Sequence, residues 1–176
     1  MIKRGGFSIV YKIEDVEKHE LYAAKVIIGD YNKEEYKRMI DREIGVLIMM
    51  NHPTIIKFIG YSMRDFNGEN NATIVMQMAQ NGSLADILEL IQKVDGPKQY
   101  NNTSRQIILV GIARGMKYLH DRNVVHRDLK PGNVLLDENF YPIITDFGLS
   151  KFFRPDQSDT LSQAGGTLIY LAPEVI

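Results

Sequence analysis

The most informative stretch of the chain is VVHRDLKPGNVLLDENFYPIITDFGLS, residues 124–150. Apolar fragments such as VLL and PIIT alternate in it with polar segments that carry Asp128, Lys130, Asn133 and Asp146. Loops between such fragments are where binding and catalytic side chains are usually placed. Two carboxylates and an amide can bind a divalent cation through oxygen, and a lysine between them can neutralise phosphate oxygens. Each residue alone would be an ordinary solvated loop residue, but together they indicate a site.

The sequence on either side of this stretch divides into two parts. Residues 1–78 are mainly strand-like, as in SIVYKIED and LYAAKVII, with one helix predicted by the apolar spacing in NKEEYKRMIDREIGVLIMMN. Residues 79–82 connect them to residues 83–176, which are mainly helical. There Ser83 and Asp86 form a capping box before LADILELIQ, the segment DGPKQYNNTS is a loop, and RQIILVGIARGMKYLH is a long helix. We therefore expect an α+β chain with a small β-rich lobe and a helical second lobe.

Further local patterns predict the smaller elements. HPTIIKFIGYS and ATIVMQM are strand-like and are joined through residues 67–68, an Asn-Gly hairpin signal. VLL and YPIIT predict a second strand pair around residues 137–139, and the chain from Asp146 onward is expected to be mostly loop. The long helix is expected to bury most of one apolar face, formed by Ile107, Ile108, Val110, Gly111, Ile112 and Met116.

The bulk composition excludes several classes of protein. The chain has 176 residues, of which 44% are hydrophobic and 24% charged, a composition typical of globular proteins. A net charge of −1 gives no field that would recruit nucleic acid or an anionic membrane. The absence of cysteine excludes disulfides and thiolate metal sites. Without a signal-peptide core or a membrane-spanning apolar run, we expect a cytoplasmic location, with the nucleus as the alternative.

The stretch quoted first resembles the catalytic segment of eukaryotic protein kinases. HRDLKPGN matches the catalytic-loop pattern H-R-D-L-x-x-x-N at every fixed position, and DFG and APE follow in the family's order. The resemblance covers residues 2–176 and implies a two-lobed fold with ATP in the cleft between the lobes. It implies that Asp128 accepts or orients the proton of the substrate hydroxyl and that Lys130 stabilises the transferring phosphoryl group. It also implies that Asn133 and Asp146 bind Mg²⁺.

The first lobe contains a pair of opposite charges. Lys25 lies in the apolar strand YAAKVII, where an unpaired ammonium group would be costly, and Glu43 lies on or beside the inward face of the predicted helix. Opposite charges on two inward-facing surfaces are natural partners. Taken alone, Lys25 could be a snorkelling side chain and Glu43 a solvated flank. The kinase resemblance implies an ion pair that holds Lys25 on the α- and β-phosphates of ATP.

The glycine-rich loop departs from the family pattern. G-x-G-x-x-G-x-V falls on KRGGFSIV, where Gly5 and Val10 match but Lys3 and Ser8 replace glycines, which puts the affinity for nucleotide in question. Gly5 and Gly6 still allow backbone N–H groups to approach phosphate closely. The resemblance implies further nucleotide contacts, around the adenine, at the gatekeeper position and in the connector, from Ile2, Val10, Ala23, Leu135, Met76, Gln77 and Ala79.

Other details resemble subgroups of the family. Lys130 together with Thr167 in GGTLIYLAPE resembles the serine/threonine-specific pattern, since tyrosine-specific catalytic loops usually carry alanine and arginine. NGSLADIL, DFGLSK and the lack of proline after Thr167 resemble the tyrosine-kinase-like group. Ser158, Thr160 and Ser162 are candidate phosphorylation sites of the activation loop, with ordinary loop hydroxyls as the alternative.

The resemblance implies an ATP-dependent protein serine/threonine kinase that acts in signal transduction. Two other functions are considered as alternatives. The two replaced glycines favour a pseudokinase or ATP-binding scaffold without turnover. A cluster of His120, Asp121, His126 and Asp128 would suit a metal hydrolase, although a histidine at a helix C-terminus such as His120 is well placed without a metal.

The chain ends on the apolar sequence GGTLIYLAPEVI, residues 165–176. In the resembled family this stretch closes the activation segment and packs under later helices. We therefore expect a partial kinase domain whose second lobe is incomplete and whose activity in isolation is doubtful. The protein substrate and the oligomeric state cannot be read from the sequence.

Overall fold

A computed structural model describes residues 1–6, 8–29, 34–93, 96–152 and 166–173. Contacts along the chain divide it into two compact units. Unit 1 comprises Met1–Met49 and Ile56–Met78, and unit 2 comprises Met50–Ile55 and Ala79–Ile176. None of the described helices is long and apolar enough to cross a bilayer.

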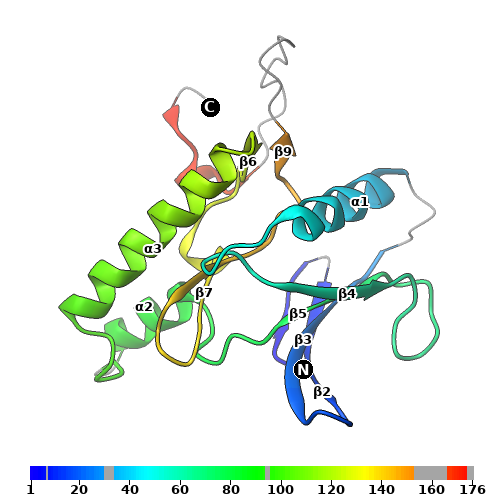
Figure 1. The fold of residues 1–176 in the computed structure, drawn as a ribbon, viewed down its shortest axis with the longest axis horizontal. Coiled ribbons are helices and arrows are strands. Elements are labelled where there is room, and N and C mark those ends of the chain that lie inside the picture. Colours follow the sequence, from blue (N-terminus) through cyan, green and yellow to red (C-terminus); the bar gives the residue numbers. More distant parts are fainter. Residues whose placement is uncertain (7, 30–33, 94–95, 153–165, 174–176) are drawn as a thin grey trace. The chain divides into compact units, whose positions relative to one another are not determined.

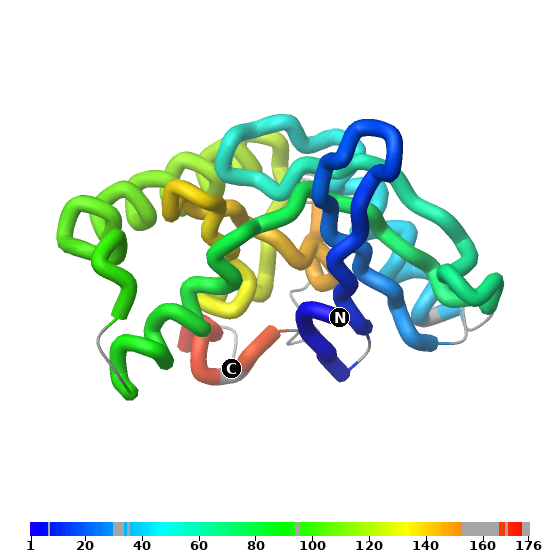
Figure 2. The backbone as a smooth tube through the Cα atoms, turned by 90° about the horizontal axis from the view of Figure 1, so that it is seen from below, coloured from blue at the N-terminus to red at the C-terminus, as the bar shows by residue number. Residues whose placement is uncertain are grey.

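Unit 1 is an antiparallel sheet with one helix. The strand order is β1-β2-β3-β5-β4 (Figure 1), and the β2–β3 hairpin is blue in Figure 2. The helix, α1, contributes Ile40, Ile44 and Leu47 to the core at helical spacing, whereas the neighbouring Ile48 is 58% exposed. The elements are β1 Lys3–Arg4, β2 Ser8–Asp15, β3 Glu20–Ile27, α1 Glu34–Met49, β4 Phe58–Ser62 and β5 Thr73–Gln77.

Unit 2 is built on two helices and short strand pairs. Strands β7 and β8 form one antiparallel pair, and β6 and β9 form another. A core cluster of Ile87, Ile108, Leu136 and Phe140 joins the helices to the β7–β8 hairpin. The elements are α2 Leu84–Lys93, α3 Asn102–His120, β6 Val124–Val125, the 3₁₀ turn η1 Pro131–Asn133, β7 Val134–Leu136, β8 Pro142–Ile144, β9 Lys151–Phe152 and the 3₁₀ turn η2 Leu168–Tyr170.

Side-chain caps define where both helices of unit 2 begin. The predicted capping box before α2 is confirmed, because the Ser83 N–H donates to Asp86 Oδ2 and the Asp86 N–H donates to Ser83 Oγ. Helix α3 begins within the segment expected to be a loop. Asn101 Oδ1 accepts from the N–H of Ser104, whose hydroxyl oxygen accepts from the N–H of Asn101, so a second capping box starts the helix three residues before Arg105.

The segment Met50–Ile55 packs with unit 2, although the sequence placed it with the first lobe. The Asn51 N–H donates to the Tyr118 hydroxyl at 2.9 Å, and the Ile144 N–H donates to the Thr54 carbonyl at 2.8 Å. Strand β4 therefore begins only at Phe58, later than the strand predicted from HPTIIKFIGYS.

Helix α3 lies close against β8 because two glycines face it. A Cβ atom on Gly111 would lie 2.4 Å from Pro142 Cγ, and one on Gly115 would lie 2.7 Å from Ile144 Cδ1. Ile108 and Gly111 are buried as expected, whereas Ile107 and Val110 are 37% and 51% exposed. The prediction that these last two residues are buried is wrong, because the contact with β8 falls on a narrower stripe than the apolar sequence suggested.

Candidate active site

Asp128 is the centre of a hydrogen-bond network in unit 2. It lies in the loop between β6 and η1 and is only 8% exposed. Its Oδ1 accepts from the Thr167 N–H at 3.0 Å and from the Thr167 hydroxyl at 2.9 Å. Its Oδ2 accepts from Lys130 Nζ at 2.7 Å and from Asn133 Nδ2 at 2.9 Å. The carboxylate is therefore held in one orientation by three side chains.

Lys130 and Asn133 are themselves held in place by this network. Lys130 Nζ also donates to Thr167 Oγ1 at 2.7 Å, which links both sides of the carboxylate. Asn133 Nδ2 also donates to the Asp128 carbonyl at 2.8 Å. Since both bonds of Asn133 use its amide nitrogen, its amide oxygen accepts no hydrogen bond within the part of the chain that the structure describes. That oxygen can serve as a ligand to a hard cation.

The ionisation of Asp128 follows from its partners. Burial alone would raise the pKa of this carboxyl, but hydrogen bonds from Lys130, Thr167 and Asn133 outweigh it and lower the pKa below its ordinary value of 3.8. Asp128 is thus a carboxylate at neutral pH. Such a group orients a hydroxyl and accepts its proton once that hydroxyl has become acidic during reaction.

His126 links the backbone at Asp128 to the backbone at Thr145. It is fully buried, its Nε2 lies 3.0 Å from the Thr145 carbonyl, and its Nδ1 lies 3.3 Å from the Asp128 N–H. A carbonyl can only accept and an N–H can only donate, so the imidazole carries its proton on Nε2. Burial lowers the pKa of His126, which keeps the ring neutral. The ring of Phe147 lies against it, with centroids 5.1 Å apart.

The metal-hydrolase alternative is wrong. Both ring nitrogens of His126 are occupied by backbone groups, and Asp121 pairs with Lys117. Among the described residues, no group of three or more histidine, aspartate or glutamate side chains is placed to hold a metal ion.

The β7–β8 hairpin brings the two predicted Mg²⁺ ligands to neighbouring strand ends. Val134 pairs with Ile144, and the Thr145 N–H donates to the Asn133 carbonyl at 3.0 Å. Asn133 therefore lies just before β7, and Asp146 lies just after β8, at the end of the hairpin where these two strands pair. Asp146 adopts φ 69°, a left-handed conformation that is uncommon outside glycine and clusters at functional sites.

In unit 1, Lys25 and Glu43 form an ion pair. Lys25 Nζ lies 2.7 Å from one carboxylate oxygen of Glu43 and 3.0 Å from the other. Glu43 is 2% exposed, so its charge is compensated almost wholly by protein groups. The pairing expected between the strand and the helix is present between β3 and α1.

The strand register places several predicted nucleotide contacts on one face of the sheet. Val10 lies opposite Lys25, and Ala23 lies opposite Met76, so these four side chains share a face, since residues 23 and 25 alternate with residue 24. Among them the gatekeeper candidate, Met76, is buried.

The glycine-rich segment forms the turn between β1 and β2. The Gly5 N–H donates to the Ser8 carbonyl at 2.8 Å, and the Ile2 N–H donates to the Val10 carbonyl at 2.7 Å. A Cβ on Gly6 would meet no atom within 4 Å, so no contact with the described residues requires glycine there.

The other predicted nucleotide contacts are Gln77, Ala79 and Leu135. Gln77 uses its side-chain oxygen to accept from the Lys57 N–H, whereas Ala79 and Leu135 belong to unit 2, where Leu135 forms a bridge with Ser83. The predicted phosphorylation sites lie outside the described residues, namely Ser158, Thr160 and Ser162.

Sequence reasoning used Thr167 as part of the serine/threonine-specific pattern but missed its contact with Asp128. Thirty-nine residues separate the two, and no local pattern predicts a hydrogen bond over that distance. The left-handed backbone of Asp146 was also missed, because the sequence carries no glycine there to signal it.

The described residues thus place a lysine–glutamate pair in the β-rich unit, and an aspartate, a lysine and an asparagine on one loop of the helical unit. The chain belongs to the protein kinase domain family, whose model matches residues 1–176. The expected α+β, protein-kinase-like fold is confirmed by this match.

Individual kinases are similar to the chain along almost all of its length. Myosin light chain kinase A of Dictyostelium discoideum is 35% identical over 177 residues, which cover 98% of this chain and 56% of that protein. A probable myosin light chain kinase of the same organism is 34% identical over 177 residues, covering 99% and 34%. The cell cycle serine/threonine-protein kinase CDC5/MSD2 of Saccharomyces cerevisiae is 32% identical over 173 residues, covering 98% and 23%. The chain thus spans less than two thirds of the length of each relative.

Proposed function

We propose that this protein is a serine/threonine kinase that transfers the γ-phosphate of ATP to protein hydroxyls. The observation that carries the proposal is the network in which Lys130 and Thr167 hold the carboxylate of Asp128. Family membership and the names of relatives as serine/threonine kinases support it.

In the proposed reaction, a serine or threonine hydroxyl of the substrate approaches Asp128. Its oxygen forms a bond to the γ-phosphorus as the bond between that phosphorus and the bridging oxygen breaks, and its proton passes to the carboxylate. Lys130, two residues along the loop, supplies a positive charge beside the transferring group. The carboxylate reaches this state without reorienting, because its hydrogen bonds already fix it.

The chain's residues fit ATP and Mg²⁺. The free amide oxygen of Asn133 and the carboxylate of Asp146 are oxygen donors of the kind that Mg²⁺ prefers, and they come from adjacent strand ends. When bound, Mg²⁺ would neutralise the phosphate oxygens of ATP. Lys25 is held by Glu43 in unit 1, where the resemblance assigns it to the α- and β-phosphates.

The proposal is tested by phosphate transfer from radiolabelled ATP to peptides that carry serine, threonine or tyrosine as the single acceptor. Full-length protein should label the serine or threonine peptide and should lose this activity when Asp128 is replaced by Asn. Magnesium-dependent ATP binding without transfer to any peptide would instead support the scaffold alternative. At present every charged catalytic position of the family pattern is filled, and no comparison favours the scaffold.

A further inference from the structure

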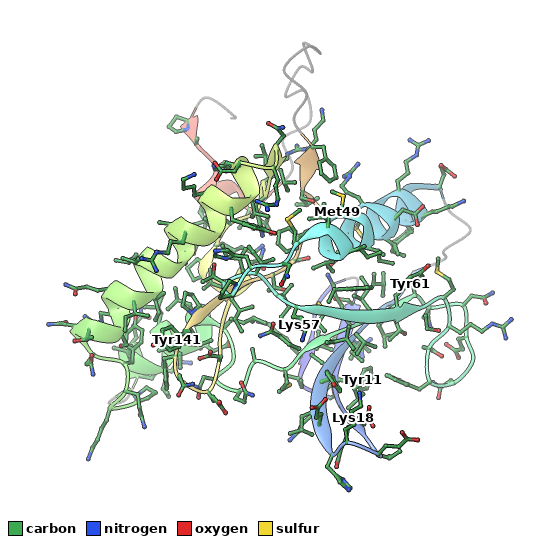
Figure 3. The ribbon with its side chains drawn as sticks, viewed as in Figure 1. Tyr11, Lys18, Met49, Lys57, Tyr61 and Tyr141 are labelled. Carbon is green, nitrogen blue, oxygen red and sulfur yellow. The ribbon has the colours of Figure 1, made fainter. Side chains whose placement is uncertain are left out.

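Helix α3 carries apolar side chains that the core of unit 2 does not cover. Ile107 and Val110 are 37% and 51% exposed, and both lie beside Gly111, the residue of α3 that packs against Pro142 of β8. Tyr141, labelled in Figure 3 beside β8, is 52% exposed as well. Isolated exposed apolar residues are normal on a protein surface, but a contiguous group that borders a hollow indicates a binding surface.

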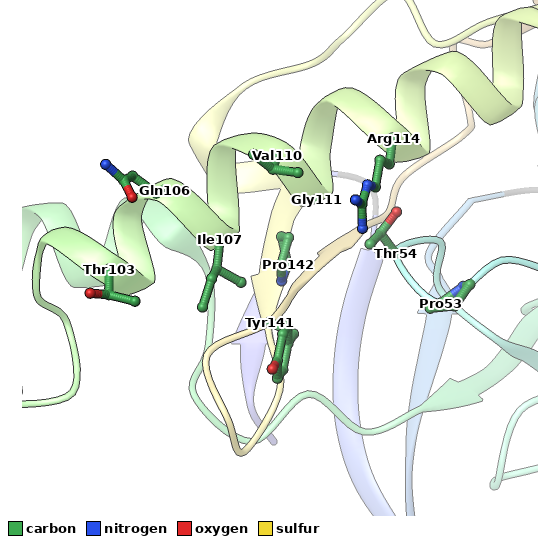
Figure 4. A pocket seen from close by; sticks show the side chains of 10 residues that line it. All are labelled: Pro53, Thr54, Thr103, Gln106, Ile107, Val110, Gly111, Arg114, Tyr141 and Pro142. Atoms are coloured by element: carbon green, nitrogen blue, oxygen red, sulfur yellow. The ribbon is translucent and has the colours of Figure 1, made fainter.

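A groove of about 460 Å³ runs along this part of α3. In Figure 4, Thr103 and Gln106 lie near one end and Arg114 near the other, with Ile107 and Pro142 between them. All of its lining residues belong to unit 2. Gly111 and Pro142, which approach each other closely, both line the groove, so helix α3 and strand β8 meet along it.

The charge of the groove is one-sided. Among the described residues that line it, Arg114 is the only charged one, and none is acidic. Within the described part of the chain, Arg114 makes no ion pair and no hydrogen bond. Other described cations of α3 are already engaged, since Lys117 pairs with Asp121 and Arg105 lies over the Tyr100 ring. A guanidinium with five donors and no partner, at the end of an apolar groove, is complementary to a carboxylate.

The length of the groove limits the size of its occupant. Thr103 and Arg114 are eleven positions apart on α3, which corresponds to about 16 Å along a helix. An extended chain advances about 3.3 Å per residue, so about five residues of an extended peptide would fill this length.

We propose that this groove docks a short extended peptide of a partner protein, with an apolar side chain between Ile107 and Pro142 and a carboxylate paired with Arg114. The carboxylate gives direction, because only one end of the groove is positively charged. The docking surface is made by unit 2 alone and includes none of the proposed catalytic residues, so it would recruit a substrate or regulator without taking part in phosphoryl transfer.

The test uses full-length protein and fluorescein-labelled, terminally blocked pentapeptides of sequence Leu-Ala-Leu-Ala-Glu, with Gln or Lys in place of Glu as controls. Fluorescence anisotropy should give a dissociation constant on the order of 10⁻⁴ M or tighter for the Glu peptide. The Gln and Lys peptides should bind more weakly than the Glu peptide, by a factor of about two to five, since a partly exposed ion pair contributes only modestly to the binding free energy. Arg114→Gln should remove this preference, and Arg114→Glu should reverse it in favour of the Lys peptide.

Two matched pairs of variants separate docking from general effects of substitution. Lys117→Gln removes a cation from the same helix outside the groove and should leave peptide binding unchanged. Val110→Ser removes an exposed apolar side chain that lines the groove and should weaken binding about threefold or more, whereas Leu109→Ser, one residue away and outside the groove, should not. Circular dichroism and melting temperature establish that each variant is folded.

Three results would overturn the proposal. The first is the absence of binding by any of the three peptides at 1 mM, a limit of about 4 kcal/mol in binding free energy. The second is equal affinity for the Glu and Lys peptides. The third is concentration-dependent dimerisation that Val110→Ser abolishes, since a second copy of the chain would then occupy the groove. None of these measurements depends on phosphate transfer, so their failure is distinct from failure of the proposed kinase activity.

Discussion

The Thr167 hydroxyl donates a hydrogen bond to Asp128 Oδ1 at 2.9 Å and accepts one from Lys130 Nζ at 2.7 Å. Thr167 lies thirty-nine residues after Asp128, so this contact joins the segment before η2 to the catalytic loop. The carboxylate is oriented from both sides, by Thr167 at one oxygen and by Lys130 and Asn133 at the other. Under the proposed function, the activity would therefore depend on how this distant segment is placed.

Replacing Thr167 by alanine should lower the rate of phosphate transfer about tenfold. The variant loses a hydrogen bond to a charged group, which typically contributes about 1.5–3 kcal/mol, although the backbone N–H bond to Asp128 remains. Steady-state kinetics with ATP and an acceptor peptide measure the effect. Thr167→Ser retains the hydroxyl and should keep most of the activity; equal activity of the alanine and serine variants would contradict the role assigned to the hydroxyl.

Removing only one partner of the ion pair in unit 1 should destabilise the protein. Lys25→Met leaves the buried charge of Glu43 without its main partner, and about 3 kcal/mol of unfolding free energy should be lost. The double variant Lys25→Met with Glu43→Leu should recover most of that stability in urea denaturation. It should not recover ATP binding, because the cation assigned to the phosphates is still absent. Recovery of nucleotide affinity by the double variant would show that Lys25 is purely structural.

The buried His126 predicts a pH dependence of stability. Its ordinary pKa of 6.5 applies to the unfolded chain, and burial lowers the pKa in the folded protein. Below pH 6.5 the unfolded chain therefore binds a proton that the folded chain does not, so the free energy of unfolding should fall as the pH decreases from 6.5 toward the lowered pKa. Asp128 does not contribute in this window, because its pKa lies below 3.8.

Urea denaturation of wild type and His126→Gln between about pH 5 and pH 7 measures this dependence. Glutamine can keep a donor and an acceptor at the site but does not titrate. The variant should show a smaller decrease in the free energy of unfolding on acidification. Parallel curves for the two proteins would mean that other groups cause the decrease.

The close contact between α3 and β8 can be tested with a pair of glycine substitutions. Gly111→Ala would place a Cβ 2.4 Å from Pro142 Cγ and should destabilise the protein by about 1–3 kcal/mol. Gly45→Ala, inside α1, meets no atom within 4 Å and should stabilise it by up to about 1 kcal/mol through helix propensity alone. Chemical denaturation compares the two, and a stabilising Gly111→Ala would refute the packing described for α3.

The sequence predicted those features that depend on local patterns. The capping box of Ser83 and Asp86 involves neighbouring residues, and the pairing of Lys25 with Glu43 follows from two inward-facing charges that need a partner. The family resemblance indicated which polar side chains within residues 124–150 belong to one site. This information came from the order of the motifs along the chain, because the local secondary-structure propensity of the residues does not provide it.

Features that depend on tertiary packing could not be predicted in this way. Apolar content at Ile107 and Val110 suggested burial, but the glycines of α3 determine which stripe approaches β8. Residues 52–55 were expected to begin a strand, but the backbone of the segment Met50–Ile55 forms hydrogen bonds with Tyr118 and with β8 of unit 2. Both errors arise because the hydrophobicity of a residue shows neither whether it finds a packing partner nor which segment that partner belongs to.

The central claim is that Asp128 acts in phosphate transfer and not in holding nucleotide. Single-turnover transfer from radiolabelled ATP to a serine or threonine peptide, with ATP affinity measured on the same samples, tests it most directly. For full-length Asp128→Asn, the account predicts a transfer rate about 10²–10⁴-fold below wild type, with the dissociation constant of ATP changed less than threefold. A transfer rate equal to that of the wild type, at equal ATP affinity, would contradict the account.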